Sequence, residues 1–219
     1  MMKKIGFYVI LLLIILFNSL SFADEQTYNR LAFYFDTGLF LYQDSPYLRR
    51  MESLGIFDRY DVWPSFDTGI FFKIRDDLSI GGSIMYALNE GDIHDGDYEG
   101  YLTLENTIFS VPVRYHIRKG IFLFSFGASL ETPFIWKSYY LSTEINQDNN
   151  GDPEISGDKF GYSVGLGLLA SIDAHVTRKI SLNLQYWFHF ALPIHDMNEY
   201  GDSLNPGGSN LVFGMKWWI

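Results

Sequence analysis

Cysteine is missing from this chain of 219 residues. Its absence excludes disulfide bonds, thiolate metal sites, cysteine nucleophiles and a lipid-modified N-terminal cysteine. Positive charge is also scarce, because 16 lysines and arginines stand against 26 aspartates and glutamates, and the formal net charge is −10. A chain this acidic is poorly suited to the phosphate backbone of a nucleic acid. We therefore expect no nucleic-acid partner.

Long apolar runs are scarce as well, and the sequence has one, over residues 5–17. Two lysines precede this run and small residues follow it, in the order typical of a secretory signal. The run is short of the roughly 20 residues that a membrane-spanning helix needs. We therefore expect a cleaved signal peptide over residues 1–23 and a single mature domain over residues 24–219, secreted through the inner membrane.

Aromatic residues are abundant at 18% of the chain, and glycine reaches 20. This composition favours strands and tight turns over helices. Apolar side chains recur at every second position, which is the period of a β-strand. Eight segments show this alternation: residues 31–43, 63–75, 78–88, 108–117, 121–136, 160–172, 180–192 and 210–219.

The predicted connections between these segments alternate in length. The short ones are residues 76–77, 118–120 and 173–179, and the long ones are residues 44–62, 89–101, 137–159 and 193–208. Short turns at one rim and long loops at the other are typical of outer-membrane barrels, with the turns periplasmic and the loops extracellular. The pattern predicts an all-β fold, an eight-stranded antiparallel up-and-down transmembrane β-barrel.

A soluble β-sandwich would also alternate, with its apolar face inward. Three features favour the membrane barrel instead: large aromatic residues on nearly every apolar face, strands of about 11–13 residues, and a signal peptide without a later membrane helix. In a barrel the apolar side chains face lipid and the polar ones face the lumen. We therefore expect the protein in the outer membrane of a bacterium.

Eight strands enclose a lumen that side chains can fill. The charged residues predicted on the lumen face balance four to four, as an ion-pair network that plugs the barrel: Asp36, Asp67, Lys73, Arg75, Arg114, Glu131, Asp173 and Lys216. Such a plug argues against a wide aqueous pore. Tyr115, Trp136 and Trp217 lie near strand ends and suit the aromatic girdles of a membrane protein.

Three short motifs resemble chemical sites, and each fits a structural interpretation better. The G-x-S-x-G pattern at residues 161–165 lies inside strand alternation rather than at a strand–helix turn. The glycines at residues 165–170 have no helix after them to form a dinucleotide site. The acidic turn at residues 148–152 has Pro153 and Lys159 where a calcium loop needs glycine and glutamate. We expect no cofactor and no metal.

An acidic segment over residues 89–100 carries five carboxylates and no lysine or arginine. One hypothesis is that it shares divalent cations with anionic lipopolysaccharide, and the plainer alternative is a solvated loop. The segment FHFAL also resembles the end of the lipid A deacylases. Those enzymes carry a His-x-Ser pair, and here Ala191 follows His189 in place of the serine. We therefore expect no enzyme, and we expect His116 and His189 to form hydrogen bonds inside the barrel.

The last six residues, GMKWWI, resemble the C-terminal signal of outer-membrane barrels, with Gly214, Trp217 and Ile219 in the motif positions. Val212 and the terminal isoleucine depart from the commonest form of that signal. The whole mature chain resembles the OmpA-like, OmpX-like and OmpW-like families of small barrels. This resemblance implies outer-membrane lipid, lipopolysaccharide and the outer-membrane assembly machinery as partners, and a monomer.

The same resemblance leaves the role open among three classes. OmpX-like barrels are linked to surface interaction, and OmpW-like barrels are linked to passage of small hydrophobic compounds. A filled lumen favours a structural or surface-interaction barrel. A gap in the wall at Pro112 or Pro133, where ladder hydrogen bonds are lost, would favour the narrow channel. A lipid A-modifying enzyme is the third class.

Overall fold

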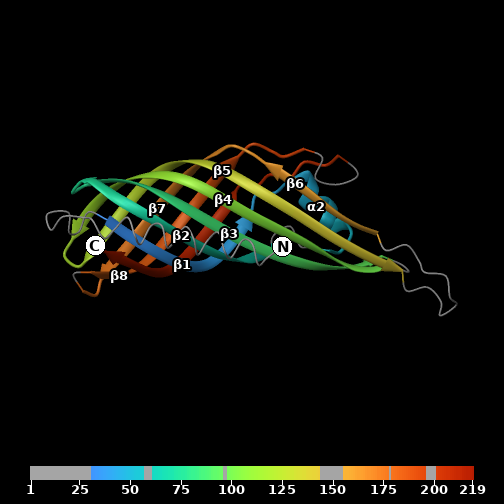
Figure 1. The fold of residues 1–219 in the computed structure, drawn as a ribbon, viewed down its shortest axis with the longest axis horizontal. Helices are drawn as coiled ribbons and strands as arrows, with labels where there is room; N and C mark the ends of the chain where they lie inside the picture. The colour runs from blue at the N-terminus through green and yellow to red at the C-terminus, as the bar shows by residue number, and fades with distance from the viewer. Residues whose placement is uncertain (1–30, 57–60, 96–97, 144–154, 178, 196–200) are drawn as a thin grey trace.

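The computed structural model describes residues 31–56, 61–95, 98–143, 155–177, 179–195 and 201–219. The described residues form nine strands and one helix (Figure 1). These elements are β1 (Leu31–Tyr42), α2 (Pro46–Ser53), β2 (Val62–Arg75), β3 (Leu78–Asp95), β4 (Tyr98–Lys119), β5 (Phe122–Thr143), β6 (Ile155–Tyr162), β7 (Gly165–His175), β8 (Ile180–Ala191) and β9 (Gly208–Trp218).

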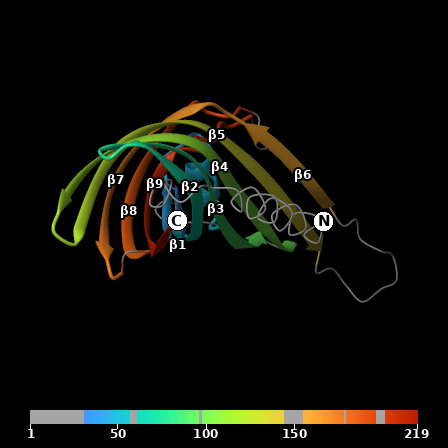
Figure 2. The ribbon, with the colours of Figure 1, turned by 60° about the vertical axis from the view of Figure 1, so that its left-hand side comes forward.

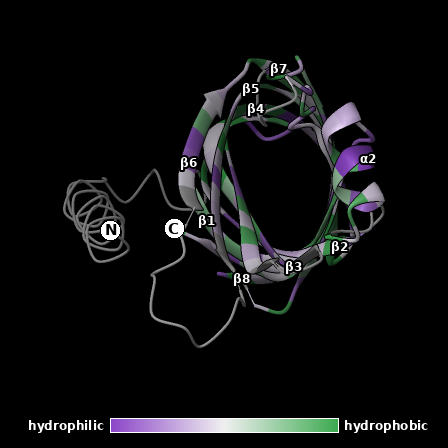
Figure 3. Ribbon diagram, turned by 90° about the vertical axis from the view of Figure 1, so that its right-hand side faces the viewer, coloured by the Kyte–Doolittle hydropathy of each residue, from purple (hydrophilic) through white to green (hydrophobic). Residues whose placement is uncertain are grey.

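The strands close into a ring (Figure 3). Around the ring the order is β1, β2, β3, β4, β5, β7, β8 and β9, and β9 pairs back onto β1. Every pairing is antiparallel, and β4 and β5 share the longest ladder. Closure leaves no free edge within the ring, as a membrane-spanning sheet requires. The prediction of an eight-stranded antiparallel barrel is confirmed.

β6 and β7 occupy one position in the wall, because both pair with β5 in the same register. The ladder is interrupted between them at Ser163 and Val164. The Ser163 N–H donates to the carbonyl of Pro133 over 2.9 Å, and Pro133 has no N–H to return the bond. The predicted strand over residues 160–172 is therefore interrupted at Ser163 and Val164. Its side chains still alternate between the two faces of the wall through the interruption.

Three neighbouring strands are much longer than the rest. β3 has 18 residues and β4 and β5 have 22 each, against 8 to 14 for the others. They extend past the rest of the barrel at one end (Figures 1 and 2). The predictions of loops over residues 89–101 and 137–159 are wrong for the residues that the structure describes. Residues 88–95 pair with 98–105, residues 98–107 pair with 134–143, and residues 155–162 pair with 134–141. Residues 144–154 of the second predicted loop lie outside the described residues. A strand outside the membrane needs no apolar face, so the alternation of apolar residues does not reveal these strand extensions.

The two ends of the barrel differ in their connections. Two-residue and four-residue turns join β2 to β3, β4 to β5 and β7 to β8 at the end where Leu31 and Ile219 exchange backbone hydrogen bonds of 3.3 and 2.8 Å. We assign this end to the periplasm, because outer-membrane barrels have their short turns there. The long connections lie at the opposite, extracellular end.

Helix α2 lies within the segment that the sequence predicts as a long loop. Ser45 caps its N-terminus, where the Ser45 hydroxyl accepts a hydrogen bond from the Leu48 N–H over 3.3 Å, and Pro46 occupies the first turn. Serine caps and first-turn prolines are common starts of helices. No helix of the described segments is long and apolar enough to span a membrane.

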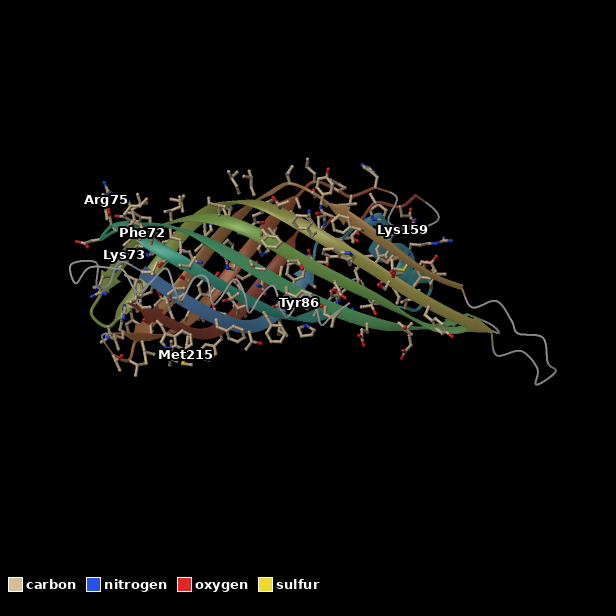
Figure 4. All side chains as sticks on the ribbon, viewed as in Figure 1. Phe72, Lys73, Arg75, Tyr86, Lys159 and Met215 are labelled. Atoms are coloured by element: carbon tan, nitrogen blue, oxygen red, sulfur yellow. The ribbon has the colours of Figure 1, made fainter. Side chains whose placement is uncertain are left out.

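The outer and inner surfaces of the barrel are inverted relative to a soluble protein. Large apolar side chains such as Leu130, Leu166 and Phe213 are more than half exposed on the outside, and Met215 lies on the same surface (Figure 4). Inside, charged and amide side chains are buried. An outward apolar belt around a polar interior is the arrangement of a barrel in lipid.

Candidate functional site

The most elaborate constellation of polar side chains lies inside the barrel. Its central layer is formed by Asp36 and Asp67, which lie opposite each other on β1 and β2 and are fully or nearly fully buried. The Gln185 amide of β8 donates to both carboxylates, over 3.0 Å to Asp36 and 3.1 Å to Asp67. Asn183 also donates to Asp36, and the Tyr34 hydroxyl donates to Asp67 over 3.0 Å. Strand alternation turns all five side chains inward.

Below this layer, toward the periplasm, Lys216 and Asp173 form a buried ion pair. The Lys216 ammonium lies 2.8 and 2.7 Å from the two carboxylate oxygens of Asp173. The two side chains are 2% and 0% exposed. Arg114 is buried beside them with its guanidinium 3.6 Å from the centre of the Phe71 ring. Buried charges are tolerated when they are paired in good geometry, and Lys216 with Asp173 meets that condition.

Above the central layer, Glu131 and His189 form a second buried cluster. The His189 Nδ1 lies 3.0 and 2.9 Å from the two oxygens of Glu131. Ser129 and Ser110 donate to the same carboxylate over 2.8 and 3.3 Å. Gly167 of β7 lies against this cluster, and a side chain there would collide with the Glu131 carboxylate. The glycine therefore makes room for the cluster.

The interior toward the extracellular end is apolar, which the strand alternation does not predict. The buried residues there come from five strands (β1 to β5), the β8–β9 connection and α2: Phe40, Tyr42, Tyr47, Leu48, Met51, Trp63, Met85, Ala87, Leu102, Leu104, Ile108, Ile135, Ile194 and Leu204. We call this set the apolar plug. The sequence does indicate this apolar interior, because large apolar residues such as Phe40 and Trp63 stand at inward positions. An interpretation that assumes a wholly polar lumen misses them.

The predicted lumen charges are placed as follows. Asp36, Asp67, Arg114, Glu131, Asp173 and Lys216 are buried in the interior, and Lys73 is half-buried near the periplasmic end. Arg75 is wrongly predicted, because its side chain is exposed and pairs with Asp77 of the adjacent turn over 2.9 Å. The β2–β3 register shifts between Lys73 and Arg75, so the alternation of faces breaks before Arg75. Figure 4 shows Arg75 at the very end of the barrel.

Most of the buried carboxylates are held by hydrogen bonds from histidine, serine, amide and tyrosine side chains rather than by the network of lysine and arginine ion pairs that the sequence predicts. Lys216 with Asp173 is the one Lys or Arg pairing among the predicted charges inside the described interior. Glu131 is bound by a histidine and two serines, and Asp36 and Asp67 are bound by amides and a tyrosine. Side chains other than lysine and arginine therefore bind three of the four buried carboxylates.

The predicted aromatic girdle and assembly residues lie on the outer wall or at its rim. Tyr115, Trp136 and Trp217 are partly exposed outside the barrel. Gly214 lies in β9 opposite Asp36, and Trp217 lies opposite Phe33 of β1. Recognition of these residues by an assembly machinery stays a prediction.

The motifs that resemble enzymes do not assemble into a reactive centre. Ser163 is buried, its hydroxyl donates to the carbonyl of Leu192 over 2.6 Å, and a strand rather than a helix follows it. Its neighbours are therefore not those of a nucleophile elbow. Within the segments that the structure describes, no group of three or more histidines, aspartates or glutamates could hold a metal ion. The acidic turn at residues 148–152 lies outside those segments.

No protein-family model matches this chain, and no curated protein matches it. Several solved structures of outer-membrane proteins are similar to it, and two of the three that follow have TM-scores above 0.5. The outer membrane protein OprG from Pseudomonas aeruginosa is similar with a TM-score of 0.53 and 11% identity, over 90% of this chain and 99% of that one. Neisserial surface protein A is similar with a TM-score of 0.51 and 16% identity, over 86% and 97% of the two chains. The outer membrane protease OmpT from Escherichia coli gives a TM-score of 0.43 and 10% identity, over 88% and 98%.

The closed ring, the outward apolar belt and the shared fold define the class of this protein, which is a bacterial outer-membrane β-barrel. More particularly, it has the small eight-stranded fold of the OmpX-like and OmpW-like type. The fold places the apolar belt in the outer membrane, with the apolar plug toward the cell exterior.

Proposed function

We propose that this protein is a closed outer-membrane barrel that binds a macromolecular partner at the cell surface. The observation that carries the proposal is the protruding sheet, which consists of residues 88–95 of β3, 98–105 of β4, 136–143 of β5, and β6. This sheet extends beyond the rest of the barrel at the extracellular end (Figure 2). Spanning the membrane does not require strands of 22 residues, since about 9–11 suffice.

The filled interior supports a role at the surface rather than in conduction. From the periplasmic to the extracellular end, the barrel contains the Lys216–Asp173 pair, then the central polar layer, then the apolar plug. The side chains of all three are buried. Helix α2 adds Tyr47, Leu48 and Met51 to the plug at the extracellular end. A solute would have to displace these packed groups to pass.

The protruding sheet has two edges that no other described strand covers. β6 pairs with β5 alone, and β3 pairs with β4 alone beyond Ala87. An uncovered strand edge can pair with an extended segment of another protein. Asp92 on β3 and Lys159 on β6 carry charge at these edges, and Lys159 lies at the protruding end (Figure 4). Such charges discourage unspecific edge pairing.

The first experiment separates a plug from a passage. The mature chain is refolded into liposomes and planar bilayers, and a shift in gel migration on boiling reports the closed barrel. We expect no single-channel conductance and no uptake of a hydrophobic dye. Stable conductance steps in the unmodified protein would contradict the closed barrel.

The second experiment tests the protruding sheet directly. Residues 92–101 are replaced by Asn-Gly, which joins Gly91 to its cross-strand partner Leu102 by a two-residue turn of the type that hairpins favour. We expect bacteria that display the shortened barrel to lose adherence to a layer of epithelial cells. The matched control places Asn-Gly at the periplasmic turn, Asp76-Asp77, and should adhere normally. Equal adherence of the two variants would refute the proposal.

A second candidate function is passage of small hydrophobic compounds, and one observation favours it. Pro133 and Pro112 both coincide with interruptions of the wall. Pro133 lies at the β6–β7 break, and Pro112 lies where the β3–β4 pairing skips two residues. The apolar plug begins beside one of these interruptions, since Ile108 of the plug pairs with Pro133. Dye uptake by liposomes that falls when Leu104 of the plug is replaced by aspartate would support this function over the first.

The remaining partners are proposed from the fold and the C-terminal residues. We expect outer-membrane lipid and lipopolysaccharide around the apolar belt, and insertion by the outer-membrane assembly machinery. We expect a monomer, because the ring closes within one chain. Size-exclusion chromatography with light scattering in detergent would reveal a higher assembly.

A further inference from the structure

The outward side of β4 ends on charges of opposite sign at its two ends. The outward residues Tyr115 and Ile117 are about half exposed, and Lys119 follows them toward the periplasm. Toward the extracellular end, the same outward series runs past Phe109 to Glu105. The lipid-facing side of β4 therefore has a cation at its periplasmic boundary and a carboxylate at its extracellular boundary.

Lys119 belongs to a patch at the periplasmic end that combines positive charge with apolar residues. Arg118 and Lys119 are both exposed at the β4–β5 turn, and Ile121 of that turn is 59% exposed. Val176, on the adjacent β7–β8 turn, is 63% exposed. His175 connects the two turns, because its N–H donates to the Ile121 carbonyl over 2.8 Å. We call Arg118, Lys119, Ile121 and Val176 the rim patch.

The two cations of the rim patch form no ion pair with a carboxylate of the described residues. The Arg118 Nη2 lies 3.4 Å from the Nε2 of His175, and this contact uses one of the five N–H bonds of a guanidinium. The β2–β3 turn differs, because Arg75 there is paired with Asp77 over 2.9 Å. The rim patch can therefore attract an anion from outside the barrel.

The apolar members of the rim patch place its cations at the depth of the lipid headgroups. Ile121 and Val176 expose apolar surface at the turns, and such surface is more stable in contact with lipid than with water. Lysine and arginine beside them can lay their apolar stems along the membrane and keep their charged ends at the interface. A cell-wall polymer would need no apolar residues at this position.

We propose that the rim patch binds the headgroup phosphate of an anionic phospholipid in the inner leaflet of the outer membrane. Positive side chains at a membrane boundary attract anionic headgroups, and the attraction falls off within a Debye length. This contact is independent of the partner proposed at the extracellular end, because it lies at the other end of the barrel and uses other residues.

Urea unfolding from lipid vesicles tests the proposal. Vesicles of phosphatidylcholine are compared at low ionic strength with vesicles that also contain phosphatidylglycerol, and the gel shift gives the fraction folded. The rim variant, Arg118→Gln with Lys119→Gln, should lower the urea midpoint further in the anionic vesicles, and added salt should remove the difference. The matched control is Arg49→Gln with Arg50→Gln, which removes two exposed arginines of α2 and should act equally in both lipids.

Two outcomes of this comparison would overturn the proposal. One is a rim variant that loses the same amount in both kinds of vesicle. The other is a control variant with the same lipid dependence as the rim variant, since that would mean a general effect of net charge.

A second measurement does not depend on a variant that folds. Native mass spectrometry of the unmodified barrel, released from an equal mixture of the two lipids, should show preferential retention of phosphatidylglycerol. Each lysine or arginine near an anionic surface strengthens binding about fivefold, so the folded rim variant should retain about fivefold less or lower still. Equal retention of the two lipids by the unmodified barrel would overturn the proposal.

Two controls separate the lipid from other anions. Inorganic phosphate at equal ionic strength should leave the retained lipid in place, and its displacement would assign the rim patch to free phosphate instead. Cosedimentation of the unmodified barrel with peptidoglycan, lost in the rim variant, would assign the rim patch to the cell wall and would likewise overturn the proposal.

Discussion

The buried pair of Lys216 and Asp173 allows the sharpest test of how the interior stabilises this barrel. Replacing Lys216 by methionine keeps most of the side-chain volume and removes the charge. Asp173, which is 0% exposed, would then be left without its cation. Breaking a buried pair in this way costs about 3–5 kcal/mol. That is a large share of the roughly 5–15 kcal/mol by which proteins are stable.

Urea unfolding from lipid vesicles, followed by the gel shift, measures this loss. With a urea dependence of about 1–3 kcal/mol per M, the midpoint should fall by about 1 M or more. The double variant Lys216→Met with Asp173→Leu should recover much of the loss, because no charge is then left unpaired. The exposed pair of Arg75 and Asp77 is the matched control, and Arg75→Met should cost about 1 kcal/mol or less.

Two results would refute this reasoning. One is a cost for Lys216→Met that is no larger than that of Arg75→Met. The other is a double variant that loses the sum of the two single losses, since that outcome would mean that the two groups act independently.

Three further predictions concern the cluster, the chain end and the helix. Gly167→Val should prevent refolding, since the new side chain meets the Glu131 carboxylate, whereas Gly82→Ala meets nothing within 4 Å; the gel shift compares them. Replacing Trp217 and Ile219 by serine should abolish insertion in cells, measured by membrane fractionation, and normal insertion would contradict the assembly signal. Burial raises the pKa of Tyr47 on α2 above its usual range. Docking of the helix should therefore hold at neutral pH and weaken above about pH 10, where an unfolded tyrosine loses its proton. Protection of the α2 amides against hydrogen exchange that does not fall above about pH 10 would contradict this.

Much of the barrel could be predicted from local pattern. Leu211, Phe213 and Met215 alternate because one face of β9 meets lipid, and a period of two needs no knowledge of the neighbouring strand. The two-residue turn Asp76-Asp77 likewise indicates a hairpin by itself. The inward positions of Asp36 and Lys216 follow from the same alternation.

Other features could not be read from pattern. Residues 88–95 alternate poorly because they lie beyond the membrane, where neither face must be apolar. Arg75 leaves the interior because the β2–β3 register shifts one position earlier. Helix α2 depends on the apolar plug for its stability, since a helix of 8 residues is marginal by itself.

The sequence by itself therefore determined the compartment, the strand count and the two faces of the wall, because these depend on local alternation and on turn length. The tertiary structure decided which inward groups meet. It brought Lys216 to Asp173 across 43 residues and Gln185 to Asp36 across 149, and it placed the Arg114 guanidinium 3.6 Å from the centre of the Phe71 ring. Strand tilt and register set these meetings, and both are properties of the closed ring rather than of any one strand.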